Sequence, residues 1–192
     1  MRALISGFGS FEGVEENPTE RLVTRLLAAP PADWELSGSV LPVSFARAPS
    51  AWDALLAREA AADVLVALGV SGRDGFQLEA AARARPLPTR HRTDNDGQVV
   101  GAVEPSSPDD LTTDLDLADL VARVATRSGQ PVTVSSDAGA YVCERTYHHL
   151  LVRARERSVP ALFVHVPTFE RIALPDQLSF LHALFAELFA PR

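Results

Sequence analysis

The sequence has a single cysteine, Cys143, so no disulfide bond can form within the chain. This scarcity fits a reducing compartment, and we expect a cytoplasmic protein in which Cys143 is either buried and inert or chemically reactive. The sequence also lacks the run of about 18 apolar residues that a membrane span requires. Its first residues turn polar and glycine-rich too early for a secretory signal. We therefore expect no membrane partner.

Basic clusters and metal-binding motifs are missing as well. The formal net charge is -7, and no group of five or more basic residues could attract a phosphate backbone, so we expect no nucleic-acid partner. The chain has neither an HExxH motif nor paired CxxC motifs, and the adjacent His148 and His149 would face different directions on a helix. We therefore expect no bound metal.

The hydrophobic pattern favours one α/β domain over residues 1–192. Short β-branched runs alternate with longer segments of helical spacing, which is typical of a three-layer α/β/α sandwich around a largely parallel, twisted sheet. Asn17 should cap the first helix, with Pro18 at its first position. The apolar side of the last helix should pack inside the fold rather than on another subunit. The predicted strands are 2–6, 39–43, 64–68, 132–135 and 161–166, and the predicted helices are 18–27, 49–61, 116–127, 141–155 and 176–189.

The segment 84–111 differs from the rest of the chain. It is rich in Pro, Asp, Ser and Arg and contains the turn signal Asp96-Gly97. A loop of this length in a compact domain is usually functional or mobile. We expect it to cover an active site, with a solvated insertion as the alternative.

Cys143 follows the predicted strand 132–135 and a turn, and falls in the first turn of a helix that would begin near Ala140. Unpaired N–H groups and the positive end of the helix dipole favour a thiolate at this position and can bind an oxyanion. Both features suit a nucleophile. A lone cysteine is otherwise more often a small buried hydrophobic side chain, so its position alone does not decide between the two.

Two further polar residues lie in apolar surroundings. His165 lies near the end of strand 161–166, and ligands bind at the carboxyl edge of an open α/β sheet. Glu79 lies in the apolar stretch 75–82, where a carboxylate is costly to bury unless it is paired, and a histidine is its obvious partner. The alternatives are a core histidine bonded to a backbone carbonyl and a glutamate exposed on an edge strand.

Several segments, in the same order along the chain, resemble the type I pyroglutamyl peptidases, also called pyrrolidone-carboxylate peptidases. Residues 6–13, SGFGSFEG, and the NPT at 17–19 resemble the family signature TGFxPFGG with NPS. Residues 139–144, GAYVCE, resemble GTFVCN around the family nucleophile, and residues 163–167, FVHVP, resemble FIHIP around the catalytic histidine. Glu79 falls at the catalytic Glu of the family's TxERVAIN, although alanines follow it here, and residues 41–45, LPVSF, resemble VPxxF.

The resemblance implies a cysteine exopeptidase that hydrolyses the amide bond after an N-terminal pyroglutamyl residue of peptides, without a metal or an organic cofactor. Cys143 would be the nucleophile, His165 its base, and Glu79 the group that orients the imidazole ring. The resemblance also implies a homo-oligomer, since members of the family are often tetramers.

Pyroglutamate is a neutral lactam, so its pocket should be mainly apolar. The segment 69–73, GVSGR, is shorter than the family's GQAGGR, which leaves open a thiol amidohydrolase acting on another small cyclic or acyl amide. A binding protein that keeps the scaffold and the pocket without catalysis is the remaining alternative. The candidate substrate-binding residues are Phe8, Phe11, Asn17, Phe45, Tyr141 and Val142, with Arg90 or Arg92 as the arginine that the family associates with the oxyanion.

Overall fold

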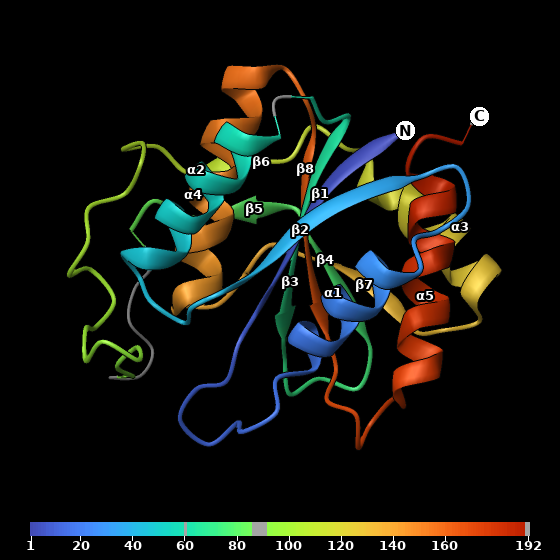
Figure 1. Ribbon diagram of the computed structural model, residues 1–192, viewed down its shortest axis with the longest axis horizontal. Coiled ribbons are helices and arrows are strands. Elements are labelled where there is room, and N and C mark those ends of the chain that lie inside the picture. The colour runs from blue at the N-terminus through green and yellow to red at the C-terminus, as the bar shows by residue number, and fades with distance from the viewer. Residues whose placement is uncertain (60, 86–91, 191–192) are drawn as a thin grey trace.

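A six-stranded sheet forms the centre of the computed structural model, which describes residues 1–59, 61–85 and 92–190 (Figure 1). The strands lie in the order β2, β1, β3, β8, β4, β7. The first four are parallel, β4 is antiparallel to β8, and β7 is parallel to β4. The prediction of a largely parallel sheet is therefore confirmed. The bounds are β1 Arg2–Phe8, β2 Glu35–Leu41, β3 Val64–Val70, β4 Phe76–Glu79, β7 Val132–Ser135 and β8 Ala161–Val166.

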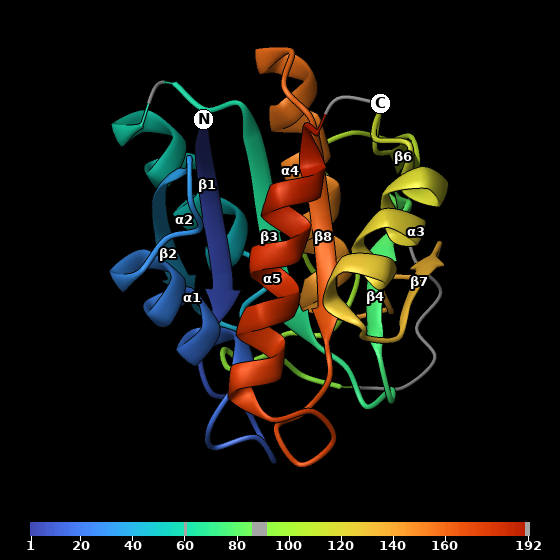
Figure 2. The ribbon, with the colours of Figure 1, turned by 90° about the vertical axis from the view of Figure 1, so that its right-hand side faces the viewer.

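Helices cover both faces of this sheet (Figures 1 and 2). Buried side chains of α1, α3 and α5 form one apolar cluster with one face of the sheet, and those of α2 and α4 form a second cluster on the other face. The three-layer α/β/α architecture follows, with the last helix packed inside the fold. The helices found in the described residues are α1 Pro18–Ala28, α2 Arg47–Arg58, α3 Leu117–Ser128, α4 Val142–Arg157 and α5 Leu174–Leu188.

Local signals in the sequence explain where α1 begins. The side chain of Asn17 accepts a hydrogen bond from the Thr19 N–H at 3.1 Å, and Pro18 occupies the first turn, so the predicted cap is confirmed. The start of α1 packs so closely against β1 that position 7 must be a glycine, because a Cβ there would lie 2.5 Å from the Thr19 carbonyl oxygen. The glycine-rich segment after β1 therefore begins where the strand and the helix are in close contact.

The long loop is closed at its base and tied down along its described length. The short strands β5 Ala81–Ala82 and β6 Leu111–Thr112, which the sequence did not predict, pair with each other where the loop begins and ends. The buried Asp94 accepts hydrogen bonds from the backbone N–H groups of Phe45, Asp96 and Gln98. Farther along, the Ser106 hydroxyl lies 2.7 Å from Nδ1 of His149 on α4. These contacts argue against a freely solvated insertion.

Over residues 1–59, 61–85 and 92–190, no helix combines the length and apolarity needed to cross a bilayer. Within the same ranges, no group of three or more His, Cys, Asp or Glu side chains is arranged to hold a metal ion.

Candidate active site

The antiparallel pairing of β4 with β8 brings Glu79 to His165. Gln77 lies opposite His165 and Glu79 lies opposite Phe163, so Glu79 and His165 are diagonal neighbours on one face of the sheet. The Nδ1 atom of His165 lies 2.7 Å from Oε1 of Glu79. Both side chains are buried, and the glutamate is 0% exposed. The alternative of a glutamate exposed on an edge strand is therefore wrong, because β4 lies between β8 and β7.

Cys143 is the second residue of α4 and lies beside the same imidazole. The helix begins at Val142, after an extended Tyr141, whereas its start was expected near Ala140 or Tyr141. Burial lowers the pKa of His165, but hydrogen bonds to Cys143 and Glu79 and the charges of both outweigh burial and raise this pKa to about 9. The imidazole is therefore protonated at neutral pH and can donate a hydrogen bond to the sulfur of Cys143.

Gly69, at the end of β3, provides the space that the sulfur occupies. It is paired with His165. The strands β3 and β8 that carry the two residues are neighbours in the middle of the sheet (Figure 2). A Cβ at this position would lie 2.7 Å from the ring of Phe163 and 3.0 Å from Sγ of Cys143. Gly69 was not among the site residues predicted from the sequence. A glycine at the carboxyl end of a central strand was the signal that could have found it.

A cavity of about 260 Å³ opens beside Cys143 and His165. This volume lies just below the range of roughly 300–1,000 Å³ usual for ligand pockets, which suits a small group. The described lining contains no aspartate or glutamate. Its residues are Phe8, Phe11, Asn17, Val43, Val70, Ser71, Gly72, Arg92, Ala138, Gly139, Tyr141, Val142, Cys143 and His165.

Most of the expected pocket residues line this cavity, but Phe45 does not. Phe45 is 2% exposed and packs edge-on against Tyr141, with 5.6 Å between the ring centroids, so it supports the pocket wall from behind. Asn17 lines the cavity while capping α1 and donating to the Gly9 carbonyl at 3.0 Å. Arg90 lies outside the described residues.

Arg92 crosses the aromatic edge of the cavity. Its guanidinium carbon lies 5.5 Å from the ring centroid of Phe11 and 4.7 Å from that of Tyr141, within cation–π distance of both. The Tyr141 hydroxyl donates to the Thr93 carbonyl at 2.8 Å. The described part of the long loop therefore borders the cavity, as expected of a cover.

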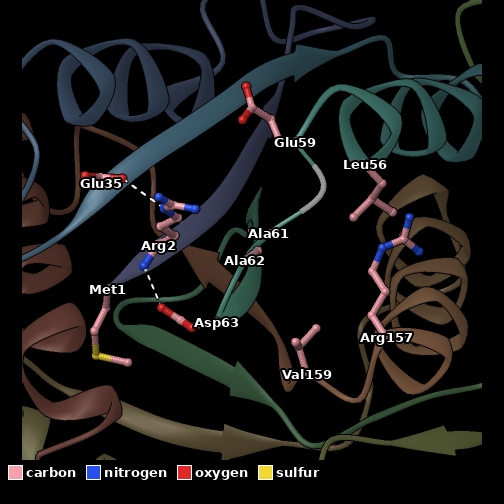
Figure 3. Close-up of a pocket in the computed structure, with 10 residues that line it drawn as sticks. All are labelled: Met1, Arg2, Glu35, Leu56, Glu59, Ala61, Ala62, Asp63, Arg157 and Val159. Atoms are coloured by element: carbon pink, nitrogen blue, oxygen red, sulfur yellow. Dashed lines mark hydrogen bonds and ion pairs between the residues drawn. The ribbon is translucent and has the colours of Figure 1, made fainter.

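A second hollow, of about 480 Å³, lies at the opposite end of the sheet, near the amino ends of β1, β2 and β3 (Figure 3). Arg2 dominates it, since its side chain pairs with Glu35 at 3.0 Å and its backbone N–H donates to Asp63 at 2.8 Å. No Cys, Ser, Thr or His belongs to its described lining. The cavity beside Cys143 and His165, at the carboxyl ends of the strands, is therefore the better candidate for an active site.

Comparison with known proteins decides the family. A family model described as pyroglutamyl peptidase matches residues 1–180. The chain belongs to the pyroglutamyl peptidase family. Among its relatives in this family, the pyrrolidone-carboxylate peptidase of Clavibacter michiganensis is 32% identical, with 85% of this chain and 77% of that protein covered. The pyrrolidone-carboxylate peptidase of Pyrococcus furiosus is 28% identical, with 93% and 84% covered.

Solved structures agree with this membership. The crystal structure of the pyrrolidone carboxyl peptidase from Fervidobacterium islandicum superposes with a TM-score of 0.82 at 28% identity, covering 97% of this chain and 96% of that one. A mutant of the Pyrococcus furiosus enzyme, at 23% identity and a TM-score of 0.85, shares the fold. The expectation of a pyroglutamyl peptidase and of its α/β fold is confirmed at the level of the family.

Proposed function

We propose that the protein hydrolyses the amide bond after an N-terminal pyroglutamyl residue of peptides. The observation that carries this proposal is the alignment of three groups: Glu79 bonded to Nδ1 of His165, and the imidazole next to Cys143 at the start of α4. This is the arrangement of an orienting carboxylate, a base and a nucleophile. Family membership supports the same chemistry.

In this mechanism, the thiolate of Cys143 attacks the carbonyl carbon of the pyroglutamyl residue. The backbone N–H groups in the first turn of α4 stabilise the resulting oxyanion, because they have no partners within the helix. The His165 imidazolium then gives its proton to the departing amine. A water molecule, deprotonated by His165, hydrolyses the thioester and releases pyroglutamate. Glu79 holds the ring so that Nε2 faces the sulfur throughout.

The cavity fits a neutral ring better than an ordinary N-terminus. The rings of Phe8, Phe11 and Tyr141 offer apolar surface to a lactam. A free α-amine is positively charged at neutral pH, and the described lining offers cations, Arg92 and His165, but no carboxylate to pair with it. Unblocked peptides would therefore lose solvation without gaining a partner, which is a basis for selectivity.

The test is hydrolysis of a pyroglutamyl fluorogenic amide by the wild type and by Cys143→Ala, next to the prolyl and alanyl amides. We expect turnover of the pyroglutamyl substrate alone, abolished in the variant. In an added panel of blocked aminoacyl amides, preference for one of these over the pyroglutamyl amide would favour the thiol amidohydrolase. A folded wild type that turns over none of the three would favour the non-catalytic binding protein. Turnover that survives in Cys143→Ala would refute the mechanism.

We also infer that the enzyme works in the cytoplasm and self-associates, as the family resemblance implies. Support comes from the single cysteine and from a groove of about 810 Å³ along α5, where Phe189 remains 40% exposed. Light scattering after size exclusion tests the association, and a monomer at micromolar concentration would contradict it.

A further inference from the structure

Arg83, at the root of the long loop, contacts the chain on both sides of the nucleophile. Its backbone N–H donates to Oε1 of Glu144 at 2.6 Å, and Glu144 directly follows Cys143. Its guanidinium donates to Oδ1 of Asp137 at 2.9 Å, in the turn before α4. Between these two contacts lies the segment 137–144, which contains the Cys143 sulfur. It also contributes four other residues to the lining of the cavity: Ala138, Gly139, Tyr141 and Val142.

The contact with Asp137 reaches an atom that shapes the turn. The same Oδ1 accepts the N–H of Gly139 at 3.2 Å, and the backbone N–H of Asp137 donates to the Ser135 hydroxyl at 3.2 Å. Gly139 has a φ of 84°, a left-handed conformation that favours glycine and reverses the chain just before the helix. Arg83 therefore holds the carboxylate on which this turn is built.

The contact with Glu144 lies in the protein interior. Glu144 is 1% exposed, and its Oε2 has no hydrogen-bond partner among the described residues. Burial raises the pKa of Glu144 to about 7, while the N–H and the charge of Arg83 lower it and the charges of Asp137 and Glu79 raise it. A buried carboxylate is costly without compensation, and Arg83 supplies both a donor and a positive charge.

Both residues depart from the family pattern quoted above. The family's GTFVCN has Asn after the nucleophile where this chain has Glu144, and its TxERVAIN has Ile four residues after the glutamate where this chain has Arg83. The hydrogen bond between them comes from the backbone N–H of residue 83, so the Arg83 side chain acts on Glu144 only through its charge, which lowers the pKa of Glu144. The positive charge at position 83 therefore partly compensates the buried acid at position 144.

We propose that Arg83 is a positioning residue for the reaction: together with Asp137 and Glu144 it brackets residues 137–144 and fixes the Cys143 sulfur and the N–H groups of the first turn of α4 relative to His165. The effect on turnover rests on the proposed function. The effect on the geometry of the thiol does not.

The first test is Arg83→Met, which removes the guanidinium but keeps the backbone N–H that binds Glu144. The Arg83 and Asp137 side chains are 43% and 62% exposed, so a surface pair of this kind should leave the melting temperature almost unchanged. We expect kcat for a pyroglutamyl amide to fall about tenfold with little change in KM, because small misplacements of reacting groups slow the chemical step. The matched control is Arg85→Met, two residues along the chain, which breaks the exposed pair with Glu104.

The second test follows alkylation of Cys143 by iodoacetamide against pH. The single cysteine makes the rate specific to the site, and it needs no substrate. Arg83→Met and Asp137→Asn should each slow alkylation at neutral pH by a similar factor, and the double variant should show no further loss. Glu144→Gln should lose the part of the profile that changes near pH 7.

The outcomes separate the two proposals. A wild type without turnover of the pyroglutamyl amide would refute the proposed function, while the alkylation series would still test whether Arg83 positions Cys143. If Arg83→Met kept the wild-type kcat and the wild-type alkylation rate, the positioning role of Arg83 would be refuted. An equal loss in Arg85→Met would refute it as well. Fully additive losses in the double variant would also overturn it, because the two side chains would then act independently.

Discussion

The imidazole of His165 and the carboxylate of Glu79 meet across two neighbouring antiparallel strands, with 2.7 Å between Nδ1 and Oε1. An ionised carboxylate can only accept, so Nδ1 carries the proton and Nε2 is left to serve Cys143. Burial opposes the imidazolium, yet its partners raise the pKa of His165 to about 9. Glu79 therefore influences both the orientation and the charge of the His165 imidazole.

Replacing the Glu79 carboxylate with an amide should change the pH dependence of activity. In Glu79→Gln the amide oxygen still accepts from Nδ1, but the hydrogen bond to a carboxylate and the charge that raise the pKa of His165 are lost. The active imidazolium then disappears at lower pH, so the alkaline limb of kcat/KM should move down in pH. We expect kcat to fall about 10²- to 10⁴-fold. Full pH profiles of both proteins check this, and superimposable alkaline limbs would contradict it.

Filling the space at Gly69 should damage the site from within the sheet. In Gly69→Ala the new methyl group would lie 2.7 Å from the ring of the fully buried Phe163 and 3.0 Å from Sγ of Cys143, so these side chains must shift. Overpacking of this kind typically costs about 1–3 kcal/mol in the free energy of unfolding. Denaturant unfolding measures it. Gly72→Ala is the control for stability, because a Cβ at Gly72 meets nothing within 4 Å. Equal unfolding free energies of the two variants would contradict the prediction.

The Tyr141 hydroxyl should matter for substrate binding. The family's GTFVCN has Phe at this position, and only the hydroxyl makes the 2.8 Å bond to the Thr93 carbonyl, next to Arg92. Tyr141→Phe keeps the ring and releases the loop, which costs about 0.5–1.5 kcal/mol for a hydrogen bond of this type. We expect KM for the pyroglutamyl amide to rise by about tenfold at most, with kcat little affected. Steady-state kinetics test this, and an unchanged KM would show that the tether does not support binding.

Much of the architecture could be predicted because its signals are local. Alternating patterns located the main strands and helices, and Asn17 with Pro18 marked the start of α1. The sequence placed β2 at 39–43, whereas it spans Glu35–Leu41, because the partly buried pattern of an edge strand carries a weak periodic signal. The antiparallel insertion of β4 between β8 and β7 depends on pairing between distant segments, which no local pattern reveals.

The same division holds for the site. Cys143 and His165 could be selected as candidates from the ends of a helix and a strand, and Glu79 from its apolar surroundings. Gly69 and Arg83 could not, because each matters through neighbours that are far away in the sequence. Phe45 was assigned to the pocket because an aromatic side chain carries no local sign of which face of a wall it occupies.

Glu144 should make the stability of the fold depend on pH. Its pKa in the folded protein is about 7, raised by burial from an ordinary value of 4.5. Below about pH 4.5 the carboxyl is protonated in both the folded and the unfolded chain, so it carries no penalty. As the pH rises toward 7, the unfolded chain releases this proton first, and the folded state loses up to about 3 kcal/mol relative to it.

Glu144→Gln removes this titration and should therefore gain stability relative to the wild type as the pH rises. The absolute effect of the amide, including its unpaired N–H groups, is the same at every pH and cancels when pH values are compared. We expect the difference in unfolding free energy between variant and wild type to shift in favour of the variant by up to about 3 kcal/mol from pH 4.5 to pH 8. Urea unfolding at the two pH values measures it. A difference that stays constant would mean that Glu144 titrates as an exposed glutamate does, and that Arg83 has no buried charge to compensate.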